Sequence, residues 1–231
     1  MDKLLKKASA TAGGTSATIR VFERLKRAIV ELGHRPGDSL SEAEVARQLG
    51  VSRQPVREAF IKLAEVGLVE IRPKRGTFVR LISQREVQNA RFIREAIETA
   101  VVRKAAIEAS EAQLKTLNAL IDRQEKYAKA GDLSGFLELD EAFHRTIAMA
   151  ADCDHAWHIV EDLKVQFDRV RFLSLPQATP IATLVDQHRA IAKAIARRDP
   201  ARAEQAMREH LAEVLKSLPK LAAEKSELFV D

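Results

Sequence analysis

Disulfide bonds, membrane spans and a secretory signal are all missing from this sequence. Cys153 is the single cysteine in 231 residues, which excludes a disulfide framework within one chain and fits the reducing cytoplasm. No apolar run approaches the roughly 18 to 20 residues that a membrane-spanning helix needs. The first residues are basic but lack the apolar segment of a secretory signal. We therefore expect a cytoplasmic protein that has no membrane partner.

Charge is unevenly distributed along the chain. Residues 1–83 contain 16 Lys and Arg against 9 Asp and Glu, whereas the remaining residues contain 22 against 24. The net charge of +5 therefore arises from the N-terminal third, which is the part expected to attract a polyanion. Charge alone does not distinguish nucleic-acid binding from simple solubility, so the order of the predicted structural elements is needed to choose between these two explanations.

Residues 18–82 show the element order of a winged helix-turn-helix, after a flexible arm over residues 1–17. Three helical patterns come first, separated by glycine-containing turns. Their apolar positions and capping residues are Ile19, Phe22, Leu25, Ile29, Ser41, Glu44, Ser52, Val56, Phe60 and Leu63. Two segments with strand character follow, residues 68–71 and 77–81, joined by the basic turn 72–76.

The start of the third predicted helix carries the residues expected to read DNA. In a helix-turn-helix, the N-terminal residues of this helix face base edges in the major groove. Arg53 and Arg57 are four residues apart and point the same way, and a guanidinium fits the two acceptors of guanine. Gln54 projects beside them. At the predicted hairpin tip, Lys74 and Arg75 can reach phosphate or the minor groove.

Four segments of this region resemble the DNA-binding domain of the GntR superfamily: PGDSLSE at 36–42, LGVSRQPVREAF at 49–60, GLV at 67–69 and RGTFV at 75–79. The resemblance covers about residues 18–81. It implies operator binding through Ser52, Arg53, Gln54, Pro55, Arg57 and the wing tip around Gly76. The chain departs from some members of the superfamily at Ala43, where they place an arginine.

Helical periodicity continues through the rest of the chain. Six helices are predicted, roughly over residues 84–108, 111–130, 133–151, 154–174, 182–198 and 200–217. No strand pattern interrupts them. The predicted fold class is therefore mainly α, with an all-α antiparallel helical bundle over residues 83–218 behind the winged helix-turn-helix. Residues 219–231 form a C-terminal tail to which the sequence assigns no function.

Four polar residues interrupt the apolar stripes of three of these helices. Asp140 and His144 lie one turn apart on one helix, His188 lies on a second and His210 on a third. A buried carboxylate is costly unless it is paired or bound to a cation. Three imidazoles and one carboxylate suit a divalent transition metal such as zinc, nickel or manganese, although a lone core histidine is more often simply hydrogen-bonded. A second polar group is better explained by helix capping and surface exposure: Cys153, Asp154, His155 and His158.

Motifs around these residues resemble the FCD ligand-binding domain, which defines the FadR subfamily of GntR regulators. They are REAIE at 94–98, DEAFH at 140–144, QHRAI at 187–191, and RD at 198–199 through MREHL at 207–211. The resemblance covers about residues 84–217. In metal-binding members, an Asp and three His occupy the positions matching Asp140, His144, His188 and His210. The resemblance therefore implies a divalent metal here, and zinc is the metal it favours most. Members that bind fatty acyl groups lack this set.

The resemblance also implies a small carboxylate as the effector. Arg94 falls at the position where family members frequently clamp a carboxylate, and a guanidinium beside a metal gives an anion two points of attachment. The alternative role for Arg94 is an i,i+4 salt bridge with Glu98. Arg171 and Arg169 are weaker candidates for the rim of the effector pocket.

The sequence therefore predicts a transcription regulator and not an enzyme. A homodimer is expected, because a pseudo-palindromic operator in double-stranded DNA pairs with two-fold protein symmetry. Release from DNA on effector binding is the commoner outcome in the family, so repression is the working hypothesis. Two alternatives stay open: a metal-dependent enzyme with a DNA-binding appendage, and a DNA binder whose metal is purely structural.

Overall fold

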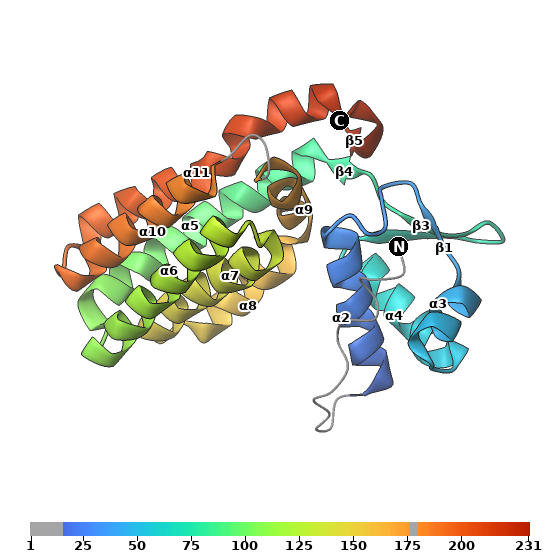
Figure 1. The fold of residues 1–231 in the computed structure, drawn as a ribbon, viewed down its shortest axis with the longest axis horizontal. Helices are drawn as coiled ribbons and strands as arrows, with labels where there is room; N and C mark the ends of the chain where they lie inside the picture. Colours follow the sequence, from blue (N-terminus) through green and yellow to red (C-terminus); the bar gives the residue numbers. More distant parts are fainter. Residues whose placement is uncertain (1–15, 176–179) are drawn as a thin grey trace.

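The computed structural model describes residues 16–175 and 180–231, which form two lobes (Figure 1). The N-terminal lobe contains α2 (Ala17–Val30), β1 (Ser39–Leu40), α3 (Glu42–Leu49), α4 (Arg53–Glu65), β2 (Val69–Arg72) and β3 (Gly76–Val79). Its strands are antiparallel in the order β1-β3-β2. This arrangement confirms the predicted winged helix-turn-helix, with β2 and β3 as the wing. Residues 1–15 of the expected arm lie outside the described residues.

Apolar residues at helical spacing build the core of this lobe, as the sequence predicted. The buried positions include Val21, Leu25, Ile29, Val45, Val56, Phe60, Leu63 and Leu68. Ile19 is an exception, because it is 42% exposed at the start of α2. Packing of α2 against α4 and of α3 against α4 fixes the direction in which the first turn of α4 projects.

Two predicted helix caps in this lobe are only half formed. Ser41 Oγ accepts the backbone N–H of Glu44, but the Glu44 carboxylate bonds Arg47 and Gln48 instead of completing a capping box. These side chains lie one turn further along the helix and compete for the carboxylate. Ser52 occupies the N-cap position of α4 with an extended backbone, but its side chain makes no cap hydrogen bond.

The C-terminal lobe is the predicted all-α bundle. Its helices are α5 (Gln84–Glu108), α6 (Glu111–Ala130), α7 (Leu133–Ala150), α8 (Asp154–Leu163), α9 (Val165–Ser174), α10 (Ile181–Ala196) and α11 (Pro200–Glu224). The main core lies between α5, α6, α7, α10 and α11, where Val102, Leu117, Phe136, Phe143 and Ile191 are buried. The Ser110 capping box of α6 is complete, because Gln113 also accepts the backbone N–H of Ser110.

The predicted single helix over residues 154–174 was wrong, because the chain breaks at Lys164 into α8 and α9. Lys164 is only 4% exposed, and its ammonium contacts the carboxylates of Glu141 and Asp168. A buried ammonium needs such partners to offset the loss of hydration. These two ion pairs hold Lys164 at the position where the helix breaks.

The end of the chain is more ordered than the sequence indicated. Helix α11 continues through Pro219 to Glu224 instead of ending near residue 217. A 3₁₀ turn (Ser226–Leu228) follows, and then β5 (Phe229–Val230) pairs in parallel with β4 (Ile82–Ser83). Phe229 packs with Ile82, Phe167 and Leu221. Strand β5 therefore lies against the segment that links the two lobes.

Helix α9 also touches the DNA-binding lobe (Figure 1). Gln166 Nε2 donates to the carbonyl of Gly67 at 2.7 Å, and Arg169 Nη2 donates to the carbonyl of Arg80 at 2.8 Å. Arg169 is fully buried, and burial lowers its pKa to about 10. The interpretation of Arg169 as a pocket-rim residue was therefore wrong. A guanidinium at this junction satisfies a backbone carbonyl that packing of the lobes removes from water.

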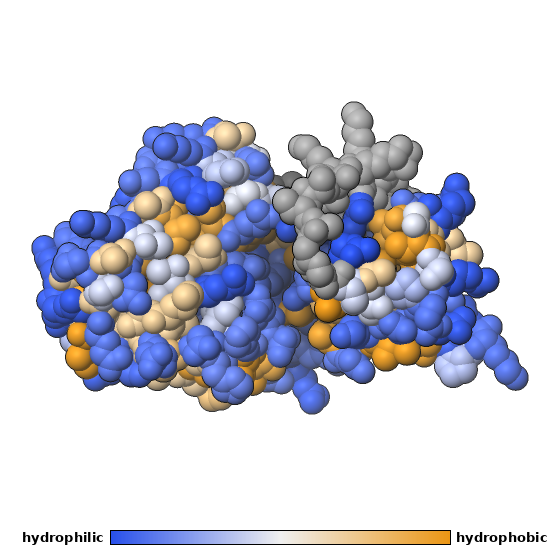
Figure 2. All heavy atoms as spheres, turned by 90° about the horizontal axis from the view of Figure 1, so that it is seen from below, coloured by the Kyte–Doolittle hydropathy of each residue, from blue (hydrophilic) through white to orange (hydrophobic). Residues whose placement is uncertain are grey.

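Hydrophilic side chains cover most of the face seen in Figure 2, and hydrophobic ones form separate patches on both lobes. None of the helices in the described ranges is long and apolar enough to cross a membrane.

Gly67 gives a test of the lobe junction. Its φ of +74° is a left-handed conformation, and a Cβ there would lie 2.9 Å from Arg80 Nη1. Gly50 has a φ of +66° but no atom within 4 Å of such a Cβ. Gly50→Ala should therefore lose about 1–2 kcal/mol of unfolding free energy from backbone strain alone. Gly67→Ala should lose slightly more, because Arg80 has to give up its hydrogen bond to the Gly67 carbonyl when it moves aside. Equal losses in denaturant titrations would mean that Arg80 moves aside freely.

Candidate metal centre and DNA-binding surface

The structure brings together the four polar residues that interrupt the apolar stripes. Asp140 and His144 come from α7, His188 from α10 and His210 from α11, and all four are buried. One ligand atom from each lies within 4.8 Å of the others. His210 Nε2 is 3.2 Å from His144 Nε2 and 3.3 Å from His188 Nε2. Asp140 Oδ1 is 3.5 Å from His188 Nε2.

An oxygen atom lies close to the outer nitrogen of each of the three imidazoles, and for His188 and His210 this contact is a hydrogen bond. His188 Nδ1 lies 2.7 Å from Gln124 Oε1, and His210 Nδ1 lies 3.1 Å from Gln187 Oε1. His144 Nδ1 lies 2.5 Å from Glu98 Oε2. An oxygen acceptor places the ring proton on Nδ1 and leaves the Nε2 lone pair facing inward.

Both glutamine amides are fixed in the required orientation. Gln124 Nε2 donates to the carbonyl of Leu139 at 3.0 Å, and Gln187 Nε2 donates to Glu213 at 2.8 Å. Each amide therefore directs its oxygen toward a histidine. Three nitrogen lone pairs and a carboxylate then converge in a buried space, which is unfavourable unless a cation lies between them. The donor set fits a divalent transition metal.

Glu98, Gln124 and Gln187 were not predicted as part of this site. Gln124 is fully buried, and it follows Leu117 and Ile121 on the inner face of α6. The signal that could have found it is the same one that found the histidines, namely a polar residue within an apolar stripe. Glu98 was considered only as a partner for Arg94.

Arg171 is bound to the central carboxylate. Its Nη2 lies 2.6 Å from Asp140 Oδ2, and its Nη1 lies 3.6 Å from Asp168 Oδ1. Burial raises the pKa of Asp140, but the Arg171 guanidinium and the three neighbouring histidines together outweigh burial and hold the pKa well below its usual range. Asp140 Oδ1 is buried and has no hydrogen-bond partner in the described part of the chain. The carboxylate is therefore ionised, with one oxygen left to face the histidines.

Arg94 satisfies the salt-bridge alternative. Its Nε donates to Glu98 Oε1 at 2.7 Å, and its guanidinium lies 4.7 Å from the centre of the Phe167 ring. Burial raises the pKa of Glu98, but Arg94 and His144 outweigh burial and lower it to about 2. Among the described residues this is the one side-chain hydrogen bond that Arg94 donates, so both of its Nη groups stay available to a ligand.

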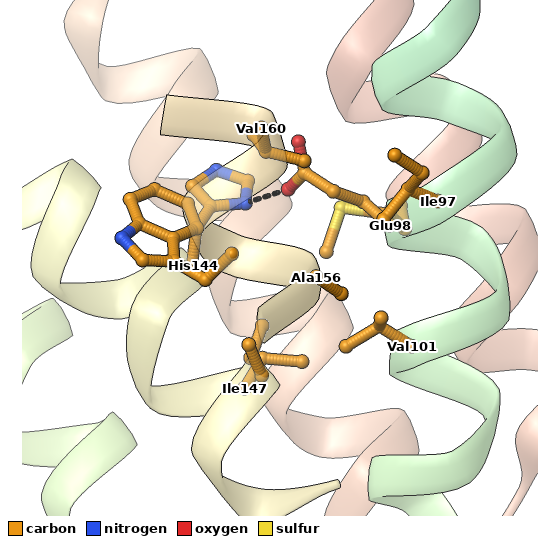
Figure 3. A pocket seen from close by; sticks show the side chains of 10 residues that line it. Ile97, Glu98, Val101, His144, Ile147, Ala156 and Val160 are labelled. Atoms are coloured by element: carbon orange, nitrogen blue, oxygen red, sulfur yellow. Dashed lines mark ion pairs between the residues drawn. The ribbon is translucent and has the colours of Figure 1, made fainter. Parts of the chain in front are cut away.

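Two small cavities border the four-residue cluster. One of about 240 Å³ is lined by Arg94, Arg171, His210 and the apolar side chains of Phe167, Leu184, Leu211 and Val214. The other, of about 250 Å³, lies between α5, α7 and α8 and is mostly apolar. In Figure 3, the ion pair between His144 and Glu98 stands at the edge of this second cavity, with Ile97, Val101 and Ile147 around it. The first cavity is the one that offers cationic groups.

The second polar group does not form a site. His155 and His158 are exposed on α8, and His158 Nδ1 lies 3.8 Å from Glu161. Cys153 Sγ lies 3.9 Å from Lys104 Nζ. These residues have the surface positions that the sequence favoured.

The residues predicted to read DNA lie on one end of the N-terminal lobe. Ser52, Arg53, Gln54 and Arg57 are exposed at the start of α4, and Pro55 is half-buried. Lys74, Arg75 and Gly76 are exposed at the tip of the wing. Sequence reasoning missed Glu42, whose carboxylate accepts two hydrogen bonds from Arg57. Only the three-dimensional contact between α3 and α4 reveals it.

A winged helix-turn-helix with a basic hairpin tip, joined to a separate helical domain, is the architecture of a DNA-binding transcription regulator. Comparison with protein families agrees in both halves. Residues 17–79 match the gntR family of bacterial regulatory proteins, and residues 90–213 match the FCD domain. The chain belongs to the GntR family of regulators that carry an FCD domain.

Relatives of known name are also regulators. The chain is 43% identical over 210 residues to the HTH-type transcriptional repressor RspR of Escherichia coli, covering 91% of this chain and 92% of RspR. It is 31% identical to a D-xylose utilization operon transcriptional repressor of Paenarthrobacter nicotinovorans, over 78% of each chain. The structure resembles E. coli McbR/YncC with a TM-score of 0.79 at 20% identity, covering 90% of this chain and 99% of that one. Both relatives matched by sequence are named as transcriptional repressors, and the likeness to McbR/YncC shows a shared fold.

The buried histidines predict a stability that depends on pH in protein stripped of metal. Burial lowers the pKa of His188 to about 3 and that of His210 well below 6.5. Below pH 6.5 the unfolded chain therefore binds protons that the folded chain does not, and stability falls as pH falls. Between pH 6.5 and 5, each histidine should contribute up to about 1.4 kcal/mol per pH unit.

Urea titrations of chelator-treated protein at several pH values measure this slope. His188→Gln should flatten the slope, whereas His158→Gln, at an exposed histidine, should leave it unchanged. A His188→Gln variant with the wild-type slope would contradict the burial of a neutral imidazole at this position.

Proposed function

We propose that this regulator holds a divalent transition-metal ion in its helical domain, bound by Asp140, His144, His188 and His210. The observation that carries the proposal is the convergence of three Nε2 atoms, with an oxygen atom close to each of the corresponding Nδ1 atoms. A set of one oxygen and three nitrogen donors favours zinc, and it can also bind nickel or manganese. When bound, the ion supplies open coordination positions for a ligand.

A small carboxylate is the effector in this proposal. The cavity beside His210 is small and is lined by the two arginines Arg94 and Arg171, so it favours a compact anion. Arg94 offers its two Nη groups, which can receive a carboxylate as a bidentate pair, while Glu98 and the Phe167 ring hold its guanidinium in place. Arg171 lines the same cavity but is engaged by Asp140, so it supports the pocket electrostatically.

Helix α9 connects this pocket with the DNA-binding lobe. Arg171 on α9 contacts Asp140, while Gln166 and Arg169 on the same helix bond the carbonyls of Gly67 and Arg80. A ligand that binds one placement of α9 better than another shifts the arrangement of the lobes by that difference in affinity. In this proposal the effector weakens operator binding, so the protein is a repressor.

The working unit in this proposal is a cytoplasmic homodimer of the FadR subfamily, whose two winged domains read a pseudo-palindromic operator. The residues that contact DNA in this proposal are Ser52, Arg53, Gln54, Pro55 and Arg57 of the recognition helix and Lys74, Arg75 and Gly76 of the wing. All of these residues except the half-buried Pro55 are exposed at one end of the lobe, which supports this assignment.

Metal content gives the first test. Purified wild-type protein should contain about one transition-metal ion per chain by plasma mass spectrometry, and His144→Ala should contain almost none. Gln124→Leu removes only the oxygen that orients His188 and should weaken metal affinity about 10- to 100-fold. His158→Ala is the matched control, because it removes an exposed histidine. Equal metal content in all four proteins would place the metal elsewhere.

A thermal-shift screen of metal-loaded protein against mono-, di- and tricarboxylates tests the effector. A binding carboxylate should raise the melting temperature of wild-type protein, by the free-energy term RT ln(1 + [L]/Kd) for native-state binding. Arg94→Leu and His144→Ala should lose the shift. If no carboxylate raises the melting temperature of protein that is confirmed to hold metal, the metal is structural or the effector belongs to another chemical class.

A further inference from the structure

Glu42 connects the two helices of the helix-turn-helix. It is the first residue of α3, and its carboxylate lies beside the start of α4. Arg57 donates from Nε to Glu42 Oε1 and from Nη2 to Glu42 Oε2, both at 3.0 Å. Arg53 Nη2 lies 4.0 Å from the same Oε2 atom. One carboxylate therefore contacts both arginines that face away from the lobe at the start of the recognition helix.

The pairing with Glu42 uses a particular edge of the Arg57 guanidinium. A guanidinium has five N–H groups, and those on Nε and on the near side of Nη2 form one edge. Glu42 occupies that edge. The end of the fork, formed by Nη1 and the far side of Nη2, has no partner among the described residues. This end carries the two parallel N–H groups that match the O6 and N7 acceptors of guanine.

The ion pair contributes little to the stability of the lobe. The side chain of Arg57 is 59% exposed and that of Glu42 is 25% exposed. An ion pair at such positions is screened by water and salt, and it typically stabilises the folded state much less than a buried contact does. A carboxylate on a DNA-binding surface also repels phosphate. Its benefit must therefore lie in something other than stability or overall affinity for DNA.

We propose that Glu42 is a specificity-determining residue, which holds Arg57 so that the end of its fork faces a base edge. The proposal rests on the proposed role of α4 as the recognition helix. With Glu42 in place, the Arg57 side chain is already ordered before DNA binds, so binding does not have to bear that entropic cost. Glu42 also keeps Arg57 from pairing with the nearest phosphate in place of the base edge. Glu42 thereby lowers affinity for all DNA and raises discrimination between bases.

The test uses the full-length protein and a duplex that the wild type selects from a random-sequence library. Binding is measured to that duplex, to each of its single-base variants and to a scrambled duplex. Four variants are compared: Glu42→Gln, Glu44→Gln, Arg57→Lys and the double variant that combines Glu42→Gln with Arg57→Lys. Glu44 is the matched control, because it lies on the same helix and loses the same charge but pairs with Arg47 instead of the recognition helix. Melting temperatures check that each variant folds.

Glu42→Gln should bind the scrambled duplex more tightly than wild type, while its discrimination at one base pair of the half-site falls at least about fivefold. Arg57→Lys should lose discrimination at the same base pair, and adding Glu42→Gln to it should cause no further loss. Glu44→Gln should keep every base preference. If Glu42→Gln keeps every preference that Arg57→Lys loses, Glu42 does not determine specificity. If Arg57→Lys loses none, the placement of the recognition helix itself is wrong, and the proposal for Glu42 falls with it.

Discussion

The buried contact between Asp140 and Arg171 sets the constraint on which the helical domain depends. A lone carboxylate in this core would cost several kcal/mol, and the guanidinium of Arg171 offsets part of that cost. Arg171 in turn contacts Asp168, and Asp168 contacts Lys164, which also bonds Glu141. Charge therefore alternates in sign along a buried chain of contacts. This network fixes the position of α9, the helix that touches both the polar site and the DNA-binding lobe.

Much of this architecture could be predicted from the sequence, because local periodicity and turn residues carry it. The winged helix-turn-helix followed from Gly50, the stripe through Phe60 and the basic turn before Gly76. The four clustered residues followed from polar side chains within apolar stripes. These signals are local, so a single sequence reveals them.

The features that the sequence did not predict all depend on contacts between distant segments. Lys164, at the break between α8 and α9, is paired with carboxylates on α7 and α9, and Arg169 bonds a carbonyl on the other lobe. Pairing of β5 with β4 joins segments of two residues each, which are too short to show a strand pattern. In the sequence, Glu98 and Gln187 cannot be distinguished from ordinary surface residues. Only the folded structure places them beside His144 and His210.

The contacts that set the arrangement of the two lobes have a consequence for the order of folding. The helices and strands of the DNA-binding lobe all lie within residues 16–79, although Val165 of α9 also packs in its core. Gln166 and Arg169, in contrast, contact backbone carbonyls that lie 99 and 89 residues away along the chain, and β5 pairs with β4, which lies still further away. Closing such long loops is entropically costly and slow, so the local structure of each lobe forms first and the contacts that orient the lobes form last.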